Sequence, residues 1–151
     1  MEQQPNVIEA INVEKTGEEG NKPPEQIIKE DSERQGLSAD LVFRKLAGLK
    51  KTSNQVRTIQ IGNTVFLVTQ VQPGTVECHI FTNEPPNVIG QRYVALVKLL
   101  KSKGMKQGYT YSDEPGFKRV AESTGLPVKV SQTTMNIGNQ IKPVYRYDME
   151  F

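Results

Sequence analysis

The chain has 151 residues, with 19 Lys and Arg against 17 Asp and Glu, one His, one Cys and no Trp. A single cysteine excludes an internal disulfide framework, and one Cys with one His cannot form a Cys/His zinc site. No apolar run approaches the ~18 residues of a membrane-spanning helix, and the polar, acidic N-terminus is not that of a signal peptide. These totals predict a soluble protein of a reducing compartment.

Residues 1–36 differ from the rest of the chain in charge and composition. They carry nine acidic and four basic side chains, a net charge of −5, whereas residues 37–151 carry a net charge of +7. Every Tyr and Phe lies at Phe43 or later. A segment without aromatic residues buries too little surface to offset the entropy lost on ordering. We therefore expect an extended or disordered acidic arm over 1–36, either solvated or ordered on a partner or on its own basic domain, and a folded domain over 37–151.

The folded part is expected to begin with a helix from Ser38 to about Lys51, with an apolar stripe at Val42, Leu46 and Leu49. Three strands follow, separated by Gly62-Asn63 and Pro73-Gly74. Their predicted ranges are 55–61, 64–71 and 75–82. Because connections this short join antiparallel neighbours, the three strands form a meander.

Alternation along the third strand divides its side chains between two faces. One face carries Thr75, Glu77, His79 and Phe81, and the other carries Val76, Cys78 and Ile80. Because Cys78 alternates with two apolar residues, we expect it to belong to the core rather than to act as a nucleophile.

The second half of the chain begins with a predicted helix over 88–103, which Asn87 caps and Gly104 ends. A strand over 106–111 comes next, followed by a short helix over 115–123 that Ser112 or Asp113 caps. Two alternating strands over 126–132 and 144–151 close the chain, and the polar segment 133–142 between them is predicted to be a loop.

This order of elements, three strands, a helix, a strand, a short helix and two strands, resembles that of the GNAT superfamily of acyl-CoA-dependent N-acetyltransferases. The resemblance covers about two-thirds of the chain. It implies an α+β fold, a mixed but mostly antiparallel sheet with flanking helices, preceded here by the extended acidic arm. It also implies a site for acetyl-CoA at the start of the long helix, where unpaired amide groups and the helix dipole attract a pyrophosphate.

The signature Q/R-x-x-G-x-G/A of that family falls on residues 87–92 and matches this chain only at Gly90. Asn87 replaces the first Gln or Arg, and Arg92 occupies a position that should be small. If coenzyme A binds, the resemblance implies that Gly90, Gln91 and Arg92 hold it. Pro85 and Pro86 remove two amide donors from this turn, and Glu84 adds a negative charge.

The resemblance also implies positions for the catalytic acid and base. The acid of the family is a Tyr four residues before a Gly on the short helix, and counting back from Gly125 gives Ala121. The base is often a Glu on the strand before the long helix, where Glu77 and His79 share one face. Glu77 and His79 are therefore the candidates for the base, and the acid is not matched.

Basic residues gather around the first helix and at the end of the second. They are Arg44, Lys45, Lys50, Lys51 and Arg57 in one group, and Lys98, Lys101, Lys103 and Lys106 in the other. This distribution leaves open a surface for nucleic acid, although lysines near helix C-termini also complement the helix dipole.

Three functions remain open from the sequence. The favoured one is a GNAT-like pseudoenzyme without a bound cofactor, a binding or structural protein that meets a protein partner through the arm 1–36. In this respect the chain is similar to the internal virion proteins of short-tailed phages. That resemblance implies a virion-associated or cytoplasmic protein. The alternative is a working acetyl-CoA-dependent N-acyltransferase with an atypical pyrophosphate loop. A basic nucleic-acid-binding domain is the third.

Overall fold

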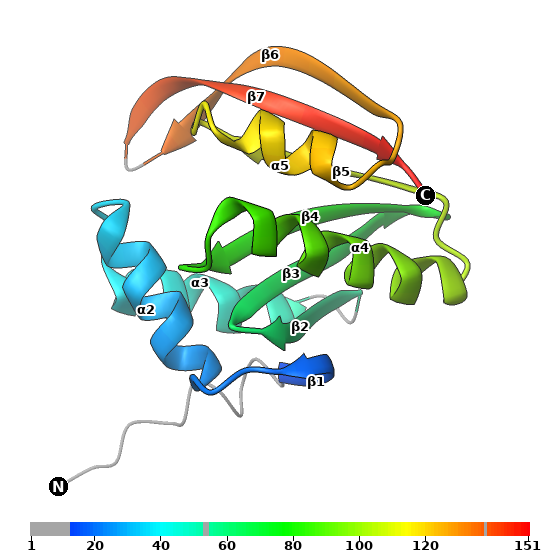
Figure 1. Ribbon diagram of the computed structural model, residues 1–151. Coiled ribbons are helices and arrows are strands. Elements are labelled where there is room, and N and C mark those ends of the chain that lie inside the picture. The colour runs from blue at the N-terminus through cyan, green and yellow to red at the C-terminus, as the bar shows by residue number, and fades with distance from the viewer. Residues whose placement is uncertain (1–12, 53–54, 138) are drawn as a thin grey trace, which may run out of the picture. The chain divides into compact units, whose positions relative to one another are not determined.

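The computed structural model describes residues 13–52, 55–137 and 139–151. Its strands form one sheet in the order β1-β2-β3-β4-β5-β7-β6 (Figure 1). The strands are β1 (Val13–Glu19), β2 (Val56–Gly62), β3 (Thr64–Gln72), β4 (Thr75–Thr82), β5 (Gln107–Ser112), β6 (Val128–Ile137) and β7 (Gln140–Glu150). The helices are α2 (Pro24–Arg34), α3 (Ala39–Thr52), α4 (Pro86–Ser102) and α5 (Phe117–Ser123). From β2 onward this is the element order predicted from the sequence.

The sheet is mixed and mostly antiparallel, as expected. β2 pairs antiparallel with β3, and β7 pairs antiparallel with both β5 and β6. Two pairings are parallel, β1 with β2 and β4 with β5, and the second of these is recorded over the first three residues of β4, Thr75–Glu77. Glycines with positive φ form the tight turns of the predicted meander, Gly62 at 60° and Gly74 at 79°.

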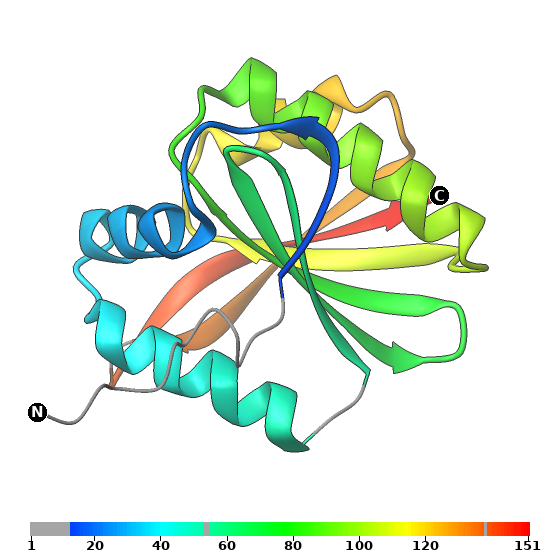
Figure 2. The ribbon, with the colours of Figure 1, turned by 90° about the horizontal axis from the view of Figure 1, so that it is seen from below.

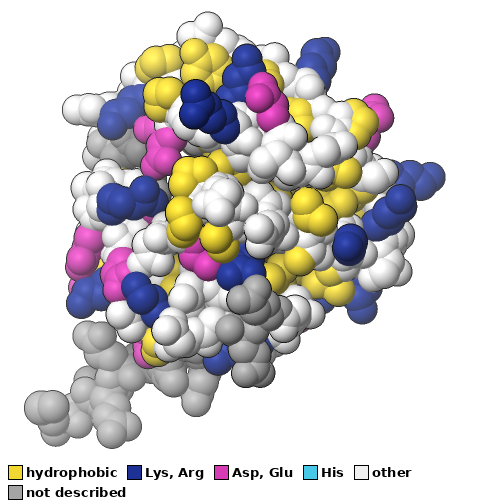
Figure 3. Space-filling view, viewed as in Figure 1, with side chains coloured by type: hydrophobic (Ala, Val, Ile, Leu, Met, Phe, Trp, Pro, Cys, Tyr) yellow, Lys and Arg dark blue, Asp and Glu magenta, His cyan; other side chains and the backbone are white. Residues whose placement is uncertain are grey.

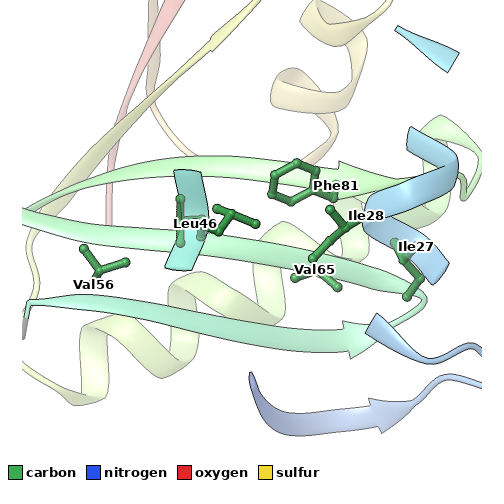
Figure 4. Close-up of a cluster of buried hydrophobic side chains, with 7 residues drawn as sticks. Ile27, Ile28, Leu46, Val56, Val65 and Phe81 are labelled. Carbon is green, nitrogen blue, oxygen red and sulfur yellow. The ribbon is translucent and has the colours of Figure 1, made fainter. Parts of the chain in front are cut away.

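The chain divides into two compact units, which we describe separately. The first contains the described residues up to Thr69 together with Ile80–Asn83, and the second contains Gln70–His79 and Glu84–Phe151. In the first unit, side chains from α2, α3 and the sheet form a buried apolar cluster (Figure 4). Its members are Ile27, Ile28, Leu46, Val56, Val65, Leu67 and Phe81.

Helix α2 corrects the expectation of an extended arm. It occupies Pro24–Arg34, and its adjacent residues Ile27 and Ile28 are fully buried. Proline at the first helical position favours helix initiation. These two isoleucines bury apolar surface although the segment has no aromatic residue. The extended conformation expected for 1–36 is therefore wrong over α2; residues 1–12 lie outside the described residues, and the domain boundary at 36/37 stays a prediction.

Polar groups of α2 also hold the end of β4 within this unit. The buried carboxylate of Asp31 accepts a hydrogen bond from the backbone N–H of Thr82 at 3.4 Å, and Arg34 donates to the carbonyl of Thr82 at 3.2 Å. Glu30 accepts a hydrogen bond from the side chain of Asn83. Helix α3 follows α2 after Gly36, which has a φ of 75°, and packs against it (Figure 2).

In the second unit, α4 and α5 pack against each other, and aromatic rings contact one another in its core. The ring of Phe117 meets Tyr147 edge-on at 4.8 Å and Tyr93 at 5.8 Å. Gly104 and Gly125 end the two helices with positive φ, as predicted.

Two local expectations in this unit are wrong. Residues 133–142 are not a loop, because β6 and β7 continue in register as far as the pair of Ile137 and Gln140. The threonines of this segment suit strands, and Asn139, with a φ of 65°, accepts the turn conformation. Helix α5 begins after Gly116 without a side-chain cap from Ser112 or Asp113.

Within the residues that the structure describes, no helix combines the length and the apolar character needed to span a membrane.

Candidate functional site

The start of α4 is the place where the sequence predicted a phosphate-binding turn. Pro85 precedes the helix in extended conformation and Pro86 is its first residue, so neither position offers an N–H. The N–H groups of Val88 and Ile89 both point to the carbonyl of Pro85, at 2.9 and 3.0 Å. Asn87 was expected to cap the helix, but it lies inside the first turn and makes no capping bond. Few backbone donors are therefore directed outward from this helix terminus.

Glu84 and Arg92 form a bidentate ion pair beside this turn. Arg92 donates from Nε to Glu84 Oε1 at 3.0 Å and from Nη2 to Glu84 Oε2 at 2.9 Å. Only 9% of the Arg92 side chain and 12% of the Glu84 side chain are exposed. The guanidinium that could have met a phosphate is thus neutralised by a carboxylate of the same turn.

Gly90 is buried on the side of α4 that faces α5. A Cβ at this position would lie 2.1 Å from the hydroxyl oxygen of Ser123, so a side chain here would have to displace that hydroxyl. Gln91 is exposed on the helix surface. The three residues predicted to hold coenzyme A, Gly90, Gln91 and Arg92, therefore lie within one turn but differ in what they face.

The predicted bases Glu77 and His79 lie on one face of β4, as expected. His79 is exposed, whereas Glu77 is half-buried and accepts a hydrogen bond from the hydroxyl of Tyr109 on β5 at 3.0 Å. This contact follows from the parallel register that places Glu77 beside Tyr109. The sequence alone offers no signal that links Tyr109 to Glu77, because the pairing of β4 with β5 is a tertiary contact.

Arg146 on β7 completes this cluster. Its guanidinium lies over the ring of Tyr109, 3.9 Å from the centroid, and its Nε donates to Asp148 at 3.0 Å. Burial raises the pKa of Tyr109 to about 12; the hydrogen bond to Glu77 and the charge of that carboxylate act in the same direction, and Arg146 opposes them. The Tyr109 hydroxyl is therefore protonated at neutral pH and serves as a donor to Glu77.

No tyrosine stands where the family would place its catalytic acid, since position 121 is a buried alanine on α5. Cys78 is buried, and burial raises the pKa of its thiol to about 12, which confirms its predicted place in the core. Tyr93 of α4 is buried as well, and burial raises the pKa of its hydroxyl.

On the face that Figure 3 shows, Asp and Glu side chains lie among the basic ones on the left, whereas several Lys and Arg side chains lie near one another on the right. Arg57, one of the residues counted for a nucleic-acid surface, pairs with Glu14. Among the described residues, no three His, Cys, Asp or Glu side chains lie close enough together to hold a metal ion.

The sequence matches no protein-family model and no curated protein. Solved structures of acetyltransferases, in contrast, share the fold. The IAA acetyltransferase of Bacillus cereus ATCC 14579 is 13% identical with a TM-score of 0.54, and the match covers 85% of this chain and 93% of that protein. The microcin C7 self-immunity acetyltransferase MccE, in complex with acetyl-CoA and AMP, is 8% identical with a TM-score of 0.60 and 84% of each chain covered.

A third structure, the Bacillus subtilis acetyltransferase in complex with CoA, is 12% identical with a TM-score of 0.50, and the match covers 68% of this chain and 82% of that protein. At these identities the likeness establishes the fold alone. The chain has the GNAT fold, as its order of elements predicted.

Proposed function

We propose that this chain is a GNAT-fold binding or structural protein that does not take up acetyl-CoA. The observation that carries the proposal is the bidentate pair of Glu84 and Arg92 at the start of α4. A pyrophosphate at this turn would meet the carboxylate of Glu84, and it would have to separate a largely buried ion pair, which costs about 3–5 kcal/mol when one partner is left uncompensated.

The backbone of the same turn adds to this obstacle. Anion sites at helix starts depend on several N–H groups that point at the ligand. Pro85 and Pro86 supply none, and the next two donors along the helix, beyond Asn87, are directed to the Pro85 carbonyl. Gly90, the one position of the family signature that this chain retains, is accounted for by the contact with Ser123. The residues present do not fit a diphosphate.

The test is thermal unfolding of the full chain with and without millimolar acetyl-CoA, with the CoA-binding Bacillus subtilis acetyltransferase as positive control. A ligand at a hundredfold excess over its Kd stabilises by about 2.7 kcal/mol, which raises Tm by several degrees. We expect the control protein to shift and this chain to shift by no more than about one degree. A shift of several degrees in this chain would overturn the proposal.

A second function, acetyl-CoA-dependent N-acyl transfer, is favoured by one observation, the hydrogen bond that holds Tyr109 to Glu77 on the sheet. A carboxylate positioned in this way suits the role of a general base. If acetyl-CoA does stabilise the chain, Gln91→Glu should reduce the shift by placing a negative charge at the start of α4, and Lys98→Glu farther along the same helix should not. Release of free thiol with an amine acceptor, lost in Glu77→Gln, would then establish the enzyme.

The partner in the favoured function is a protein. The proposal that it binds through residues 1–36, in a setting such as a phage virion, is supported by the sequence resemblance and by the charge difference between this segment and the rest of the chain. Because part of this segment is helix α2, the test is copurification with a variant that reverses exposed charges only, Glu25→Lys and Lys29→Glu. Retained assembly by that variant would count against these two side chains as the contact.

A further inference from the structure

The second unit has a pocket on its sheet, at the end of β4 away from α4. Its volume is about 340 Å³, at the lower end of the range for small-molecule sites. Side chains and backbone from β3, β4, β5, β6 and β7 line it, including Thr75, Gln107, Tyr109, Lys129, Arg146, Asp148 and Glu150. The pocket shares Tyr109, Arg146 and Asp148 with the cluster around Glu77 but contains no residue of α4. A ligand here would not occupy the turn before α4, and it goes beyond the proposed function.

Some of the charges in this pocket are already paired. Arg146 binds Asp148 through Nε at 3.0 Å and through Nη2 at 3.0 Å, and it also stacks on Tyr109. Gln107 donates from Nε2 to the hydroxyl of Thr75 at 3.0 Å. These contacts fix the floor of the pocket without an external ligand.

Two opposite charges at the rim are not paired in this way. Lys129 and Glu150 are exposed, and neither side chain makes a hydrogen bond or an ion pair with any residue that the structure describes. The register places Lys129 opposite Asp148, and Glu150 is two residues further along β7 on the same face. Such diagonal neighbours are ~7–8 Å apart. One positive and one negative charge therefore line the same pocket.

We infer that this pocket binds a small zwitterion of the α-amino acid class, with its carboxylate toward Lys129 and its ammonium group toward Glu150. A ligand with a single charge would satisfy one rim residue and leave the other facing a neutral group. A zwitterion satisfies both, and the amide of Gln107 and the hydroxyl of Thr75 offer neutral hydrogen-bonding groups to the rest of the molecule.

The first experiment follows the backbone amide signals of Gly108 and Lys129 by NMR in the full chain during titration with four probes. L-glutamine carries both charges, L-glutamine amide lacks the carboxylate, N-acetyl-L-glutamine lacks the ammonium group, and D-glucose is neutral. We expect saturable shifts with L-glutamine, and binding about two- to fivefold weaker for each singly charged analogue, the range of an exposed ion pair. No saturation with L-glutamine, or tighter binding of glucose or of either analogue, would overturn the inference.

Charge variants provide the second experiment. Lys129→Glu and Glu150→Lys should each weaken L-glutamine binding, and the double variant with both changes should restore it, because the zwitterion binds in the reverse orientation. Lys118→Glu makes the same change of charge on α5, outside the pocket, and should leave binding unchanged. Equal affinity in all four variants would place the ligand elsewhere and refute the site.

Discussion

The Cα of Gly90 on α4 faces Ser123 on α5 so closely that a Cβ at residue 90 would lie 2.1 Å from the Ser123 hydroxyl oxygen and 3.3 Å from its Cβ. That hydroxyl donates to the carbonyl of Val120 at 2.6 Å, which fixes its position. The absence of a side chain at residue 90 thus leaves room for this hydroxyl and its hydrogen bond.

We therefore expect Gly90→Ala to destabilise the protein by about 1–2 kcal/mol, because overpacking outweighs the gain of about 1 kcal/mol in helix propensity. In a Ser123→Ala background the same change should cost about 1 kcal/mol less, because the obstructing oxygen is gone. Urea unfolding of the four proteins in this cycle measures the coupling. Additive effects would contradict the packing role of Gly90.

The pair of Glu84 and Arg92 should matter strongly for stability. Arg92→Ala leaves a largely buried carboxylate without its partner and should cost about 3 kcal/mol. The double variant Glu84→Gln and Arg92→Gln should cost less, because it leaves no uncompensated charge. The control is Arg119→Ala on the exposed side of α5, which should change stability by less than about 0.5 kcal/mol. Chemical denaturation measures all three, and an equal cost of Arg92→Ala and Arg119→Ala would refute the prediction.

Helix α2 should behave as part of the core. Ile28→Ala removes a fully buried side chain and should destabilise by about 2–5 kcal/mol. The same substitution at Ile141, which is 78% exposed, should have little effect. For the same reason, deletion of residues 1–36 should lower Tm rather than leave it unchanged. An unaltered Tm after deletion would show that α2 does not contribute to the stability of the fold.

The turns and the order of elements could be predicted because they depend on local signals. Gly62, Gly74 and Gly104 all have the positive φ that their places in the sequence indicated. Helix α2 could not be predicted in this way, because the burial of Ile28 depends on partners such as Leu46 and Phe81, which are far away in sequence.

The candidate site residues were chosen from the motif and from strand alternation, and their roles stay predictions. Their contacts depend on the tertiary structure. The register of β4 and β5 brings Tyr109 to Glu77 across 32 residues of sequence. Asn87 was expected to cap α4. Because Pro86 suits the first helical position, the helix begins at Pro86, one residue before Asn87.

The pKa of the Tyr109 hydroxyl should depend on its neighbours Glu77 and Arg146. Glu77→Gln should lower this pKa from about 12, because it removes a negative charge and a hydrogen bond that favours the protonated phenol, although burial continues to raise it. Arg146→Gln should have the opposite effect, because the guanidinium favours the phenolate. Titration of the Tyr109 ring signal by NMR measures both. Shifts in the same direction would contradict the arrangement of the cluster.

Cys78 should resist modification in the folded protein. Burial raises the pKa of its thiol from 9.0 to about 12, so thiolate is scarce at pH 8. Labelling with a thiol reagent should be slow under native conditions and fast in denaturant. Because the folded-state pKa is raised, the stability from this buried thiol is complete below about pH 9 and is lost as pH rises toward 12. Rapid native labelling would contradict the assignment of Cys78 to the core.

Strand β6 ends the sheet order, and over its ten residues Lys129 is the single charged side chain, with no proline. Charges, prolines and bulges are the usual means by which edge strands avoid joining other sheets. This border of the protein thus has little protection against unwanted strand addition. Handling the molecule at high concentration will depend on keeping that border covered or on introducing further charge along it.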